Sequence, residues 1–598
     1  MAETETTHVR GSELTLASLV AAVLVSAVMG LAYPYMVLKL GFGPNVSIVS
    51  AFFGFVVLSA FVFLGGSYDR WQNNIVQTAG TSAAATAFMC IVLASFDMLR
   101  ESKLVTFALA PTQTQVFIWL TTASVLGVLL AVPMRRHFVV DEKLPFPDGM
   151  AAAETLKVLD PPRDAAKTDL IYVQARRAAV LLGIGLLASA GLMLFREDAQ
   201  IFKYIPEGWT PGDLVWGATG ASFVVAAMGV GVSYSLLSIG SGMIIGLRIS
   251  LWLMVGVALG FLAAPYLLTQ QGILPDTPTR TQVLFWVMWP AIGMIVAAGM
   301  TILALRWRLL REAFRALGTA GTSGDEFPIG IVIVGSAILM IVLCYLQEAY
   351  FGLPVWMSAV AIVISIPLML VGLRALGETN WGPISALSNM MQGLFAAIAP
   401  GNVNANILGN ATTGTIASTS EGLMQDYKAG HIIGSTPRAM TIAQLIGAPI
   451  GAAALAWIYP QLVATYGIVG ENAGLAAPSA RRAAGFAEIL SAGVSALPPF
   501  ALEAMAIAIV LGIVLALAEN TRWRELVPSP TGLGLGLLLP FAAVATIFVG
   551  AVIGAIWWTI APRSAGVYAI PIASGFIAGE ALIAVLVPLL LWLGLGAT

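Results

Sequence analysis

The sequence predicts an all-α polytopic membrane protein with about sixteen transmembrane helices. Three observations lead to this fold class: 58% of the 598 residues are apolar, only 10% are charged, and the apolar residues gather in long runs. The mean hydropathy is +0.89, whereas a soluble domain carries about 25% charged residues. Most of this chain therefore cannot face water.

The apolar runs give the expected order of the helices, since a span needs about 20 mostly apolar residues. In the first half they centre near residues 25, 55, 86, 124, 185, 223, 252 and 293. In the second half they centre near residues 338, 363, 390, 410, 448, 508, 545 and 582. The run from Leu14 to Met36 exceeds the roughly 7–15 apolar residues of a signal peptide. We therefore expect it to be retained as the first helix.

Recurring motifs predict two parallel halves of about eight helices each. Phe42-Gly43-Pro44 opens the second span, and Phe351-Gly352-Leu353-Pro354 opens the tenth. The third and eleventh spans are marked in the same way, by Asn73 to Gln77 and by Ser388 to Gln392. We expect a cytoplasmic tail at 1–13, an N-terminal transmembrane half at 14–310, a cytoplasmic linker at 311–327 and a C-terminal transmembrane half at 328–598.

Positive charge gathers in loops that lie on one side of the predicted membrane. By the positive-inside rule that side is the cytoplasm, and both termini share it, so we expect a multi-pass protein of the cell (inner or plasma) membrane. Arg481 and Arg482 lie in a long loop placed outside and are the exception. The basic clusters are Arg135, Arg136, Lys143, Lys157, Arg163, Lys167, Arg176 and Arg177, then Arg306, Arg308, Arg311 and Arg315, then Lys428 and Arg438, then Arg522 and Arg524.

Charge balance and the scarcity of metal ligands exclude several classes of function. Lys and Arg number 29 against 31 Asp and Glu, so no basic surface points to nucleic acid. Cys90 and Cys344 lie inside apolar runs, which argues against disulfides and against a zinc or iron–sulfur site. His8, His137 and His431 are too widely spaced for a His-rich metal site. The sequence implies no cofactor and no bound metal, and it leaves open whether the protein forms a homo-oligomer.

The segment 389–438 is the most informative part of the chain. It reaches membrane depth by hydropathy, yet it is rich in amides and hydroxyls, and Pro400-Gly401, Gly409 and Gly414 predict interrupted or re-entrant helices near 381–420. Such groups are tolerated where they face protein or a water-filled cavity. An interrupted amide-rich pair of spans indicates a transporter's binding site, although the same residues also serve helix packing. The candidate substrate-binding residues are Asn389, Gln392, Asn404, Asn406, Asn410, Thr412 and Thr413.

Two longer segments carry a resemblance to a known family. Residues 420–430 read SEGLMQDYKAG and residues 434–438 read GSTPR, while residues 143–154 read KLPFPDGMAAAE. The first pair is similar to the "LMQD-K-G … PR" signature of the oligopeptide transporter superfamily, and the last to its "LPFP-G-A-A" segment. The stretches 41–50, 73–77 and 573–580 also fit, so the resemblance runs from the first loop to the last span. It is closest to the yellow-stripe-like and prokaryotic branches.

The resemblance implies a carrier of about sixteen spans that couples solute entry to protons. Its implied substrates are small peptides or metal chelates, such as those of nicotianamine and related siderophores. The peptide-transporting eukaryotic branch typically shows Asn-Pro-Gly and Lys-Ile-Pro-Pro-Arg motifs. Only Pro437-Arg438 of the second remains here, and Ala399 precedes Pro400-Gly401. This departure puts peptide specificity in doubt.

The charged residues of the LMQD segment form a second candidate set. Glu421, Asp426, Lys428 and Arg438 are expected to bracket the cytoplasmic end of the substrate path. Such a set offers donors to a solute's carboxylate and acceptors to its amine. The alternative is a salt-bridged loop that seals the end of a helix pair. The LPFP segment is expected to be structural, with an extended stretch leading into a helix that begins near Asp148.

Two isolated carboxyls inside apolar runs are candidates for proton coupling. Glu580 lies in the last predicted span after Gly575 and Gly579, and Glu503 lies in the run 498–517 as the reserve candidate. A charge at the bilayer centre costs at least about 2.5–3.5 kcal/mol, so such a carboxyl stays protonated or finds a partner. Either behaviour suits proton coupling. The alternative for each is a neutral carboxyl that is hydrogen-bonded between two helices.

Rival functions lack their motifs in this sequence. An intramembrane enzyme would need a His-Glu-x-x-His pair, a Gly-x-Gly-Asp motif or a Ser/His pairing, and the spans contain none of them. An ATP-driven pump would need a Walker A motif, which is missing. A channel remains possible, but an amide-rich broken pair within a duplicated architecture fits alternating access better. The sequence therefore favours a secondary transporter.

Overall fold

The structure is a computed structural model. It describes residues 12–592 except 41–45, 64–67, 161–169, 198–201, 203, 213–214, 219–220, 306–325, 380–381, 383, 471–472, 493–497 and 523–525. Most of the predicted tail at 1–13, most of the predicted linker at 311–327 and the Phe42-Gly43-Pro44 motif therefore lie outside the described residues.

Helices dominate the first half of the chain. They are α1 (Leu16–Leu40), α2 (Val46–Phe63), α3 (Arg70–Ala87), α4 (Cys90–Arg100), α5 (Gln113–Ala131), the π-helical turn η1 (Arg136–Asp141), α6 (Pro147–Leu159), α7 (Leu170–Phe195), α8 (Leu236–Ile245), α9 (Leu247–Ala258), the π-helical turn η4 (Leu259–Ala263), α10 (Ala264–Gln270) and α11 (Arg280–Leu305). Between α7 and α8 lie β1 (Gly208–Trp209), β2 (Val215–Ala218), β3 (Ala221–Val224), the 3-10 turn η3 (Val225–Met228) and β4 (Val232–Ser233).

Helices are the only regular elements among the described residues of the second half. Its helices are α13 (Ile329–Phe351), α14 (Val355–Thr379), α15 (Ile384–Ile398), α16 (Val403–Ile433), α17 (Pro437–Tyr466), α18 (Pro478–Ala492), α19 (Ala501–Glu519), α20 (Pro530–Leu538), α21 (Phe541–Ile560) and α22 (Pro562–Trp592). Within the described ranges, 11 helices are long and apolar enough to cross a membrane. The fold is thus that of a polytopic membrane protein, while sixteen helices in two parallel halves stay a prediction.

The span expected near residue 223 is wrong. Strands β2 and β3 form an antiparallel pair there, with Val215 opposite Val224 and Trp216 opposite Phe223. Gly212, Gly217 and Gly220 interrupt this apolar run, and glycine disfavours a helix interior. The β-branched and aromatic residues between these glycines favour strands instead.

The interruption predicted at Pro400-Gly401 is confirmed, whereas the breaks at Gly409 and Gly414 are wrong. Helix α15 ends at Ile398, and Gly401 adopts a left-handed φ of +76° before α16 begins. Helix α16 then continues for 31 residues through both other glycines. A Cβ at Gly409 would collide with the ring of Phe395. This glycine therefore serves the close packing of α15 on α16 rather than a break.

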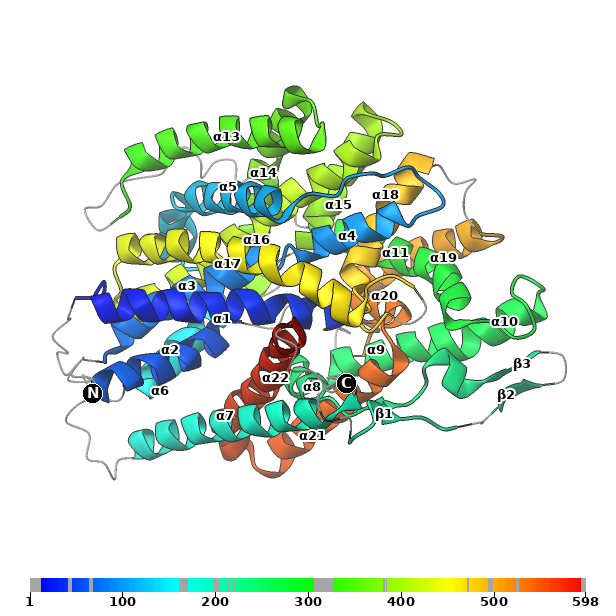
Figure 1. The fold of residues 1–598 in the computed structure, drawn as a ribbon, viewed down its shortest axis with the longest axis horizontal. Coiled ribbons are helices and arrows are strands. Elements are labelled where there is room, and N and C mark those ends of the chain that lie inside the picture. Colours follow the sequence, from blue (N-terminus) through cyan, green and yellow to red (C-terminus); the bar gives the residue numbers. More distant parts are fainter. Residues whose placement is uncertain are drawn as a thin grey trace.

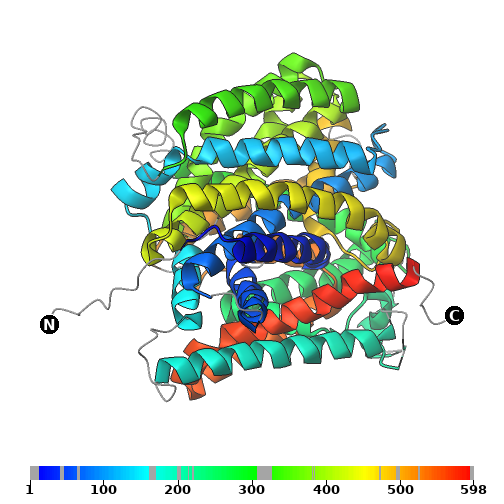
Figure 2. The ribbon, with the colours of Figure 1, turned by 60° about the vertical axis from the view of Figure 1, so that its left-hand side comes forward.

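Six helices form a continuous stack across the molecule. In Figure 2 they follow one another from top to bottom as α13, α5, α17, α1, α22 and α7, and each packs on the next. Helices α3 and α16 lie inside this stack, where α3 packs on α1 and α17, and α16 packs on α5, α14 and α15. Figure 1 shows the hairpin β2–β3 projecting at the edge of the molecule, beside α10.

Packing divides the helices into two groups that do not follow the two sequence halves. One group contains α1–α6 and α13–α18, and the other contains α7–α11 and α19–α22. Each group therefore combines helices from both halves of the chain. The groups meet chiefly where α1 packs on α22 (Figure 1). The predicted division into residues 14–310 and 328–598 remains a statement about the sequence repeat.

Close backbone contact joins α3 to α17 at the centre of the first group. A Cβ at Gly447 would collide with the carbonyl oxygen of Ala79, and one at Gly451 with that of Ala83. Small residues let membrane helices approach closely enough for extensive van der Waals contact. These two glycines therefore set the distance between α17 and α3.

Replacing these glycines tests that contact. Gly447→Ala and Gly451→Ala should each destabilise the protein by about 1–3 kcal/mol, because the added methyl group forces the helices apart. Thermal unfolding of purified protein in detergent measures the effect. Gly393→Ala in α15 is the matched control, since nothing lies within 4 Å of its added Cβ. Equal melting temperatures for all three variants would contradict the assigned contact.

Candidate functional site

Polar side chains at membrane depth gather on α3, α16 and α17. Helix α3 is buried on almost every side, although it carries amides and hydroxyls along most of its length. The sequence pattern identified Asn73 to Gln77 as a repeat marker and as part of the family resemblance, but it did not predict this polar core. The available signal was the density of amides in a span of low hydropathy. The buried polar residues of α3 are Gln72, Asn73, Asn74, Gln77, Thr78, Thr81, Ser82 and Thr86.

Asp426 lies at the centre of this polar core. Asp426 is fully buried, with 0% of its surface exposed. The Nε2 atom of Gln77 on α3 donates to Oδ1 of Asp426 at 2.6 Å, and Nε2 of Gln444 on α17 donates to Oδ2 at 2.5 Å. Gln77 also donates to the hydroxyl of Thr81 at 3.0 Å. Three helices therefore converge on one carboxyl group through neutral partners.

Glu421 and Lys428 lie on the same helix and form no ion pair with any described residue. Glu421 is buried, and its Oε1 atom accepts no hydrogen bond from the described residues. Its carboxyl lies against the backbone of Gly372 and Gly382. Lys428 is 9% exposed. The alternative of a salt-bridged loop is therefore not what these residues form.

The LMQD segment is helical and buried, which corrects the expectation of a loop at the cytoplasmic mouth. Residues 421–428 lie inside α16, because no strong helix breaker occurs before Gly434, whose φ of +80° ends the helix. Pro437 then occupies the first turn of α17, where proline is favoured. Arg438 follows it on the exposed side of that turn. Of the four predicted residues, only Arg438 lies at a helix end.

The amides of α15 and α16 bind one another. Gln392 donates from Nε2 to Oδ1 of Asn406 at 2.9 Å and to the carbonyl oxygen of Ala483 at 3.0 Å. Asn406 donates back to the Gln392 carbonyl at 2.9 Å, and Asn410 donates to Gln392 Oε1 at 3.0 Å. These contacts tie α15, α16 and α18 together. Gln392, Asn406 and Asn410 therefore have a structural role in this conformation.

Of the remaining four predicted substrate-binding residues, two form hydrogen bonds with neighbouring helices. Gln347 on α13 donates to the hydroxyl of Thr412 at 2.7 Å, and Thr413 shares a hydrogen bond of 2.8 Å with Ser365 on α14. Asn389 is buried on α15, and Asn404 is half-buried in the first turn of α16.

The LPFP segment docks directly on the LMQD segment. The Phe146 N–H donates to the carbonyl oxygen of Gly377 at 2.9 Å, and the Gly149 N–H donates to Oε1 of Gln425 at 2.7 Å. A Cβ at Gly149 would collide with the Gln425 backbone. The helix α6 begins at Pro147, so the helix start near Asp148 is confirmed. The stretch before it is not extended throughout as expected, because Lys143 and Phe146 adopt left-handed φ angles of +53° and +43°. The two most specific motifs of the sequence thus meet at one contact.

Several buried acceptors of the polar core receive no hydrogen bond from the described residues. Each buried acceptor without a donor costs about 1–3 kcal/mol, and a membrane interior supplies no water except in a cavity. We therefore expect this core to be reached by water or by a polar solute. The oxygen atoms are Oδ1 of Asn74, Oε1 of Gln77, Oε1 of Gln347, Oε1 of Glu421 and Oε1 of Gln444.

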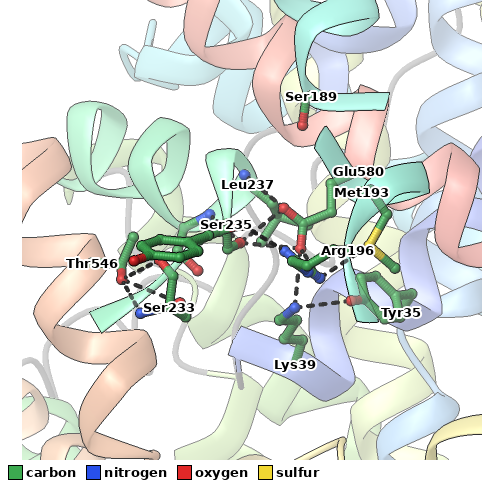
Figure 3. A network of polar contacts seen from close by, with 12 residues as sticks. Tyr35, Lys39, Ser189, Met193, Arg196, Ser233, Ser235, Leu237, Thr546 and Glu580 are labelled. Atoms are coloured by element: carbon green, nitrogen blue, oxygen red, sulfur yellow. Dashed lines mark hydrogen bonds and ion pairs between the residues drawn. The ribbon is translucent and has the colours of Figure 1, made fainter. Parts of the chain in front are cut away.

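Glu580 lies in a separate ionic network where the two helix groups meet (Figure 3). Its Oε1 atom accepts from Lys39 Nζ of α1 at 3.0 Å and from the Arg196 guanidinium at 3.2 Å. Its Oε2 atom accepts from the Ser235 hydroxyl at 2.8 Å and from the Leu237 N–H at 3.1 Å, both at the start of α8. Of the two behaviours expected for a buried carboxyl, Glu580 shows the one with partners.

The glycines before Glu580 allow α7 to approach α22 closely. A Cβ at Gly575 or at Gly579 would collide with a carbonyl oxygen of α7, that of Leu182 or that of Leu186. Glu503, the reserve candidate, is exposed in the first turn of α19 and therefore lies at a helix end. Among the residues that the structure describes, no group of three His, Cys, Asp or Glu side chains could hold a metal ion.

The Glu580 network predicts a stability effect. Glu580→Gln should destabilise the protein by about 3–5 kcal/mol, because it leaves the buried Arg196 and the half-buried Lys39 without their carboxylate. Thermal unfolding in detergent measures the loss. Glu503→Gln is the matched control, since its carboxyl is exposed. A Glu580→Gln variant as stable as this control would show that the ion pairs contribute nothing.

Comparisons with known proteins agree with the geometry. The family model described as OPT oligopeptide transporter protein matches residues 13–591. A Saccharomyces cerevisiae protein named for oligopeptide transport is 24% identical over 587 residues, which cover 79% of this chain and 80% of that protein. A Haemophilus influenzae protein named for the same function is 24% identical, with 73% of this chain and 71% of that protein covered.

Plant proteins that are named for metal-nicotianamine transport match over an even larger share of the chain. A metal-nicotianamine transporter of Oryza sativa subsp. japonica is 23% identical, with 95% of this chain and 91% of that protein covered. The family match spans the first helix, the polar core and the last helix alike. The chain therefore belongs to the OPT oligopeptide transporter family, and it is a membrane transporter rather than an enzyme.

Proposed function

We propose that this protein is a proton-coupled secondary transporter that moves small peptides or metal chelates across the cytoplasmic membrane. The observation that carries the proposal is the polar core of α3, α16 and α17, which combines buried carboxyls with acceptors that lack donors. Groups of this kind at membrane depth mark substrate and ion pathways. The relatives named for oligopeptides and for metal-nicotianamine complexes supply the two substrate classes.

The core offers partners to both ends of a zwitterionic solute. Unpaired amide and carboxyl oxygens, such as those of Gln77 and Glu421, suit an ammonium group or the N–H groups of a peptide. Lys428, two residues after Asp426, and Arg438, six residues before Gln444, are cations that suit a carboxylate. A metal–nicotianamine complex presents the same carboxylates around a metal that arrives already chelated. The same groups therefore suit both substrate classes.

The broken pair α15–α16 is the proposed gate of the path. Helix α15 has 15 residues and extends about 22 Å, which is less than the roughly 30 Å of the hydrocarbon core. Helix α16 has 31 residues and extends about 46 Å. We propose that Asn389, Gln392, Asn404, Asn406, Asn410, Thr412 and Thr413 face solute when their mutual hydrogen bonds open during alternating access.

Membrane orientation and coupling residues complete the proposal. By the positive-inside rule, the side where α1 and α17 begin is the cytoplasm, so the start of α1 and Arg438 lie there. Helix α22 ends on the opposite side of the helix stack (Figure 2), which contradicts the expectation that both ends of the chain share one side. Glu580 and Glu503 remain the sequence-based candidates for proton coupling. Glu580 would have to exchange its contacts with Lys39 and Arg196 to load a proton. Glu503 is exposed and would meet protons at the membrane surface.

Uptake into liposomes tests the proposed function. Purified protein should concentrate iron(II)–nicotianamine or trialanine when the interior is made alkaline, because inward proton flow drives the solute inward. An inward Na⁺ gradient at equal pH should not do so. Equilibration without accumulation would identify a channel instead, and accumulation driven by Na⁺ alone would overturn proton coupling.

Cysteine accessibility tests the proposed gate. Single Cys substitutions at Asn389, Gln392, Asn404, Asn406, Asn410 and Thr413 should react with a water-soluble thiol reagent, and iron(II)–nicotianamine or trialanine should slow the reaction at some of them. The background variant replaces Cys90 and Cys344, which are both buried. Ser336→Cys on α13, which is buried away from this pair, is the control. Failure of all six positions to react would favour a purely structural role.

A further inference from the structure

Two kinds of buried carboxyl occur in this protein, and they differ in their partners. Glu580 contacts two cations, Lys39 and Arg196, which favour its charged form. Asp426 is equally buried, yet its side-chain partners are neutral. The amides of Gln77 and Gln444 donate to its two oxygen atoms, and the Thr81 hydroxyl also contacts it. A carboxylate without a cation is expensive in a low-dielectric interior. Asp426 is therefore the carboxyl that gains more from binding a proton.

Charged groups on the elements around Asp426 do not compensate its charge. None of the described ones forms an ion pair with it, and those with assigned partners bind each other, as Arg374 binds Glu142 and Lys157 binds Glu154. Helices α5 and α15 carry no charged residue at all. His137 on η1 contacts Glu142, and Arg482 on α18 donates to Ser385. The further charged or titratable groups on these elements are Glu421, Lys428 and His431 on α16, Arg70 on α3, Arg438 on α17, Asp148 on α6, Arg136 and Asp141 on η1, and Arg481 and Glu488 on α18.

The two amides can serve either charge state of Asp426. In the arrangement described, both donate through Nε2, which suits the ionised carboxylate, and both Oε1 atoms accept no bond. A half-turn of one amide presents its Oε1 to the carboxyl, where it can accept the O–H of a protonated Asp426. That oxygen gives up no existing hydrogen bond in the process. The site is therefore built to hold a proton as well as to release it.

We propose that Asp426 is the site that carries the coupled proton, with Gln77 and Gln444 as positioning residues. The inference rests on the proposed function and names the residue that performs its coupling. A proton from water on one side of the membrane binds one Asp426 oxygen, and one amide turns to accept it. Release to the other side restores the carboxylate and both amide donors. No covalent bond other than this O–H bond forms or breaks.

The position of Asp426 links its charge state to helix packing. Gln77 belongs to α3 and Gln444 to α17, and both helices contact α16. Gln77 also donates to Thr81 at 3.0 Å, so turning its amide exchanges a second hydrogen bond. The Ser82 hydroxyl on α3 donates to the main-chain carbonyl oxygen of Gln444 at 2.8 Å, which ties α3 to α17 at the same residue. Loading a proton therefore changes contacts among the three helices that form the polar core.

Infrared difference spectroscopy tests the assignment without any substrate. Protein in lipid bilayers is taken from high to low pH while the C=O stretch of protonated carboxylic acids is recorded. The parent should show a titrating band for Asp426 and one for Glu421, which are both buried and form no ion pair with any described residue. Asp426→Asn should lose one of these bands, which is the Asp426 band. Glu421→Gln is the matched control, because it removes a buried carboxyl two turns away or less on the same helix, and it should keep the Asp426 band.

A second variant protects the test against misfolding of Asp426→Asn. Gln444→Leu removes one donor to the ionised form, so the Asp426 band should titrate about 1–2 pH units higher. The assignment is overturned if Asp426→Asn loses no titrating band, or if Glu421→Gln loses the Asp426 band. It is also overturned if the pH midpoint of the Asp426 band stays the same in Gln444→Leu. Accumulation by the parent in liposomes separately tests the proposed function. A parent that accumulates solute while the band assigned to Asp426 belongs to another residue would sink only that assignment.

Discussion

Polar groups that are buried at membrane depth need partners, and this constraint shapes the whole first group of helices. An acceptor or carboxyl without one costs several kcal/mol in hydrocarbon, so α3 and α16 can exist only when other helices enclose them. Helices α1, α5, α14 and α17 provide that enclosure. The glycines of α17 bring its backbone against α3 closely enough for Gln444 to reach Asp426. The close packing of these helices and the pairing of their buried polar groups therefore depend on each other.

The second group of helices meets the first through an ionic contact rather than through a polar core. Glu580 of α22 joins Lys39 of α1 to Arg196 at the end of α7 and to the start of α8 (Figure 3). Such a contact is strong while all partners are present and costly when one leaves. It therefore fixes how α1 lies on α22. In a transporter whose helix groups move against each other, this network would be a natural place for that movement to start or stop.

Hydropathy and motifs predicted the membrane class, the family and the helix start near Asp148, because those features depend on local composition. They did not predict the hairpin near residue 223, where glycines and β-formers outweighed apolar content. They also did not predict that residues 421–428 continue α16. The glycines of this helix do not interrupt it, because glycine breaks a helix only where packing does not need it. The amides of α3 and α16 could be identified from the sequence as polar at depth. Their partners, such as Gln77 for Asp426, could not, because the pairing joins residues 349 positions apart.

The central claim is that the core of α3, α16 and α17 is a wet pathway rather than a sealed packing contact. A high-resolution cryo-EM map of the protein in lipid nanodiscs tests this most directly. The account predicts ordered water, or bound solute, within hydrogen-bonding distance of Oε1 of Gln77 and Oε1 of Gln444. A dry core in which protein donors bind both oxygen atoms would contradict it.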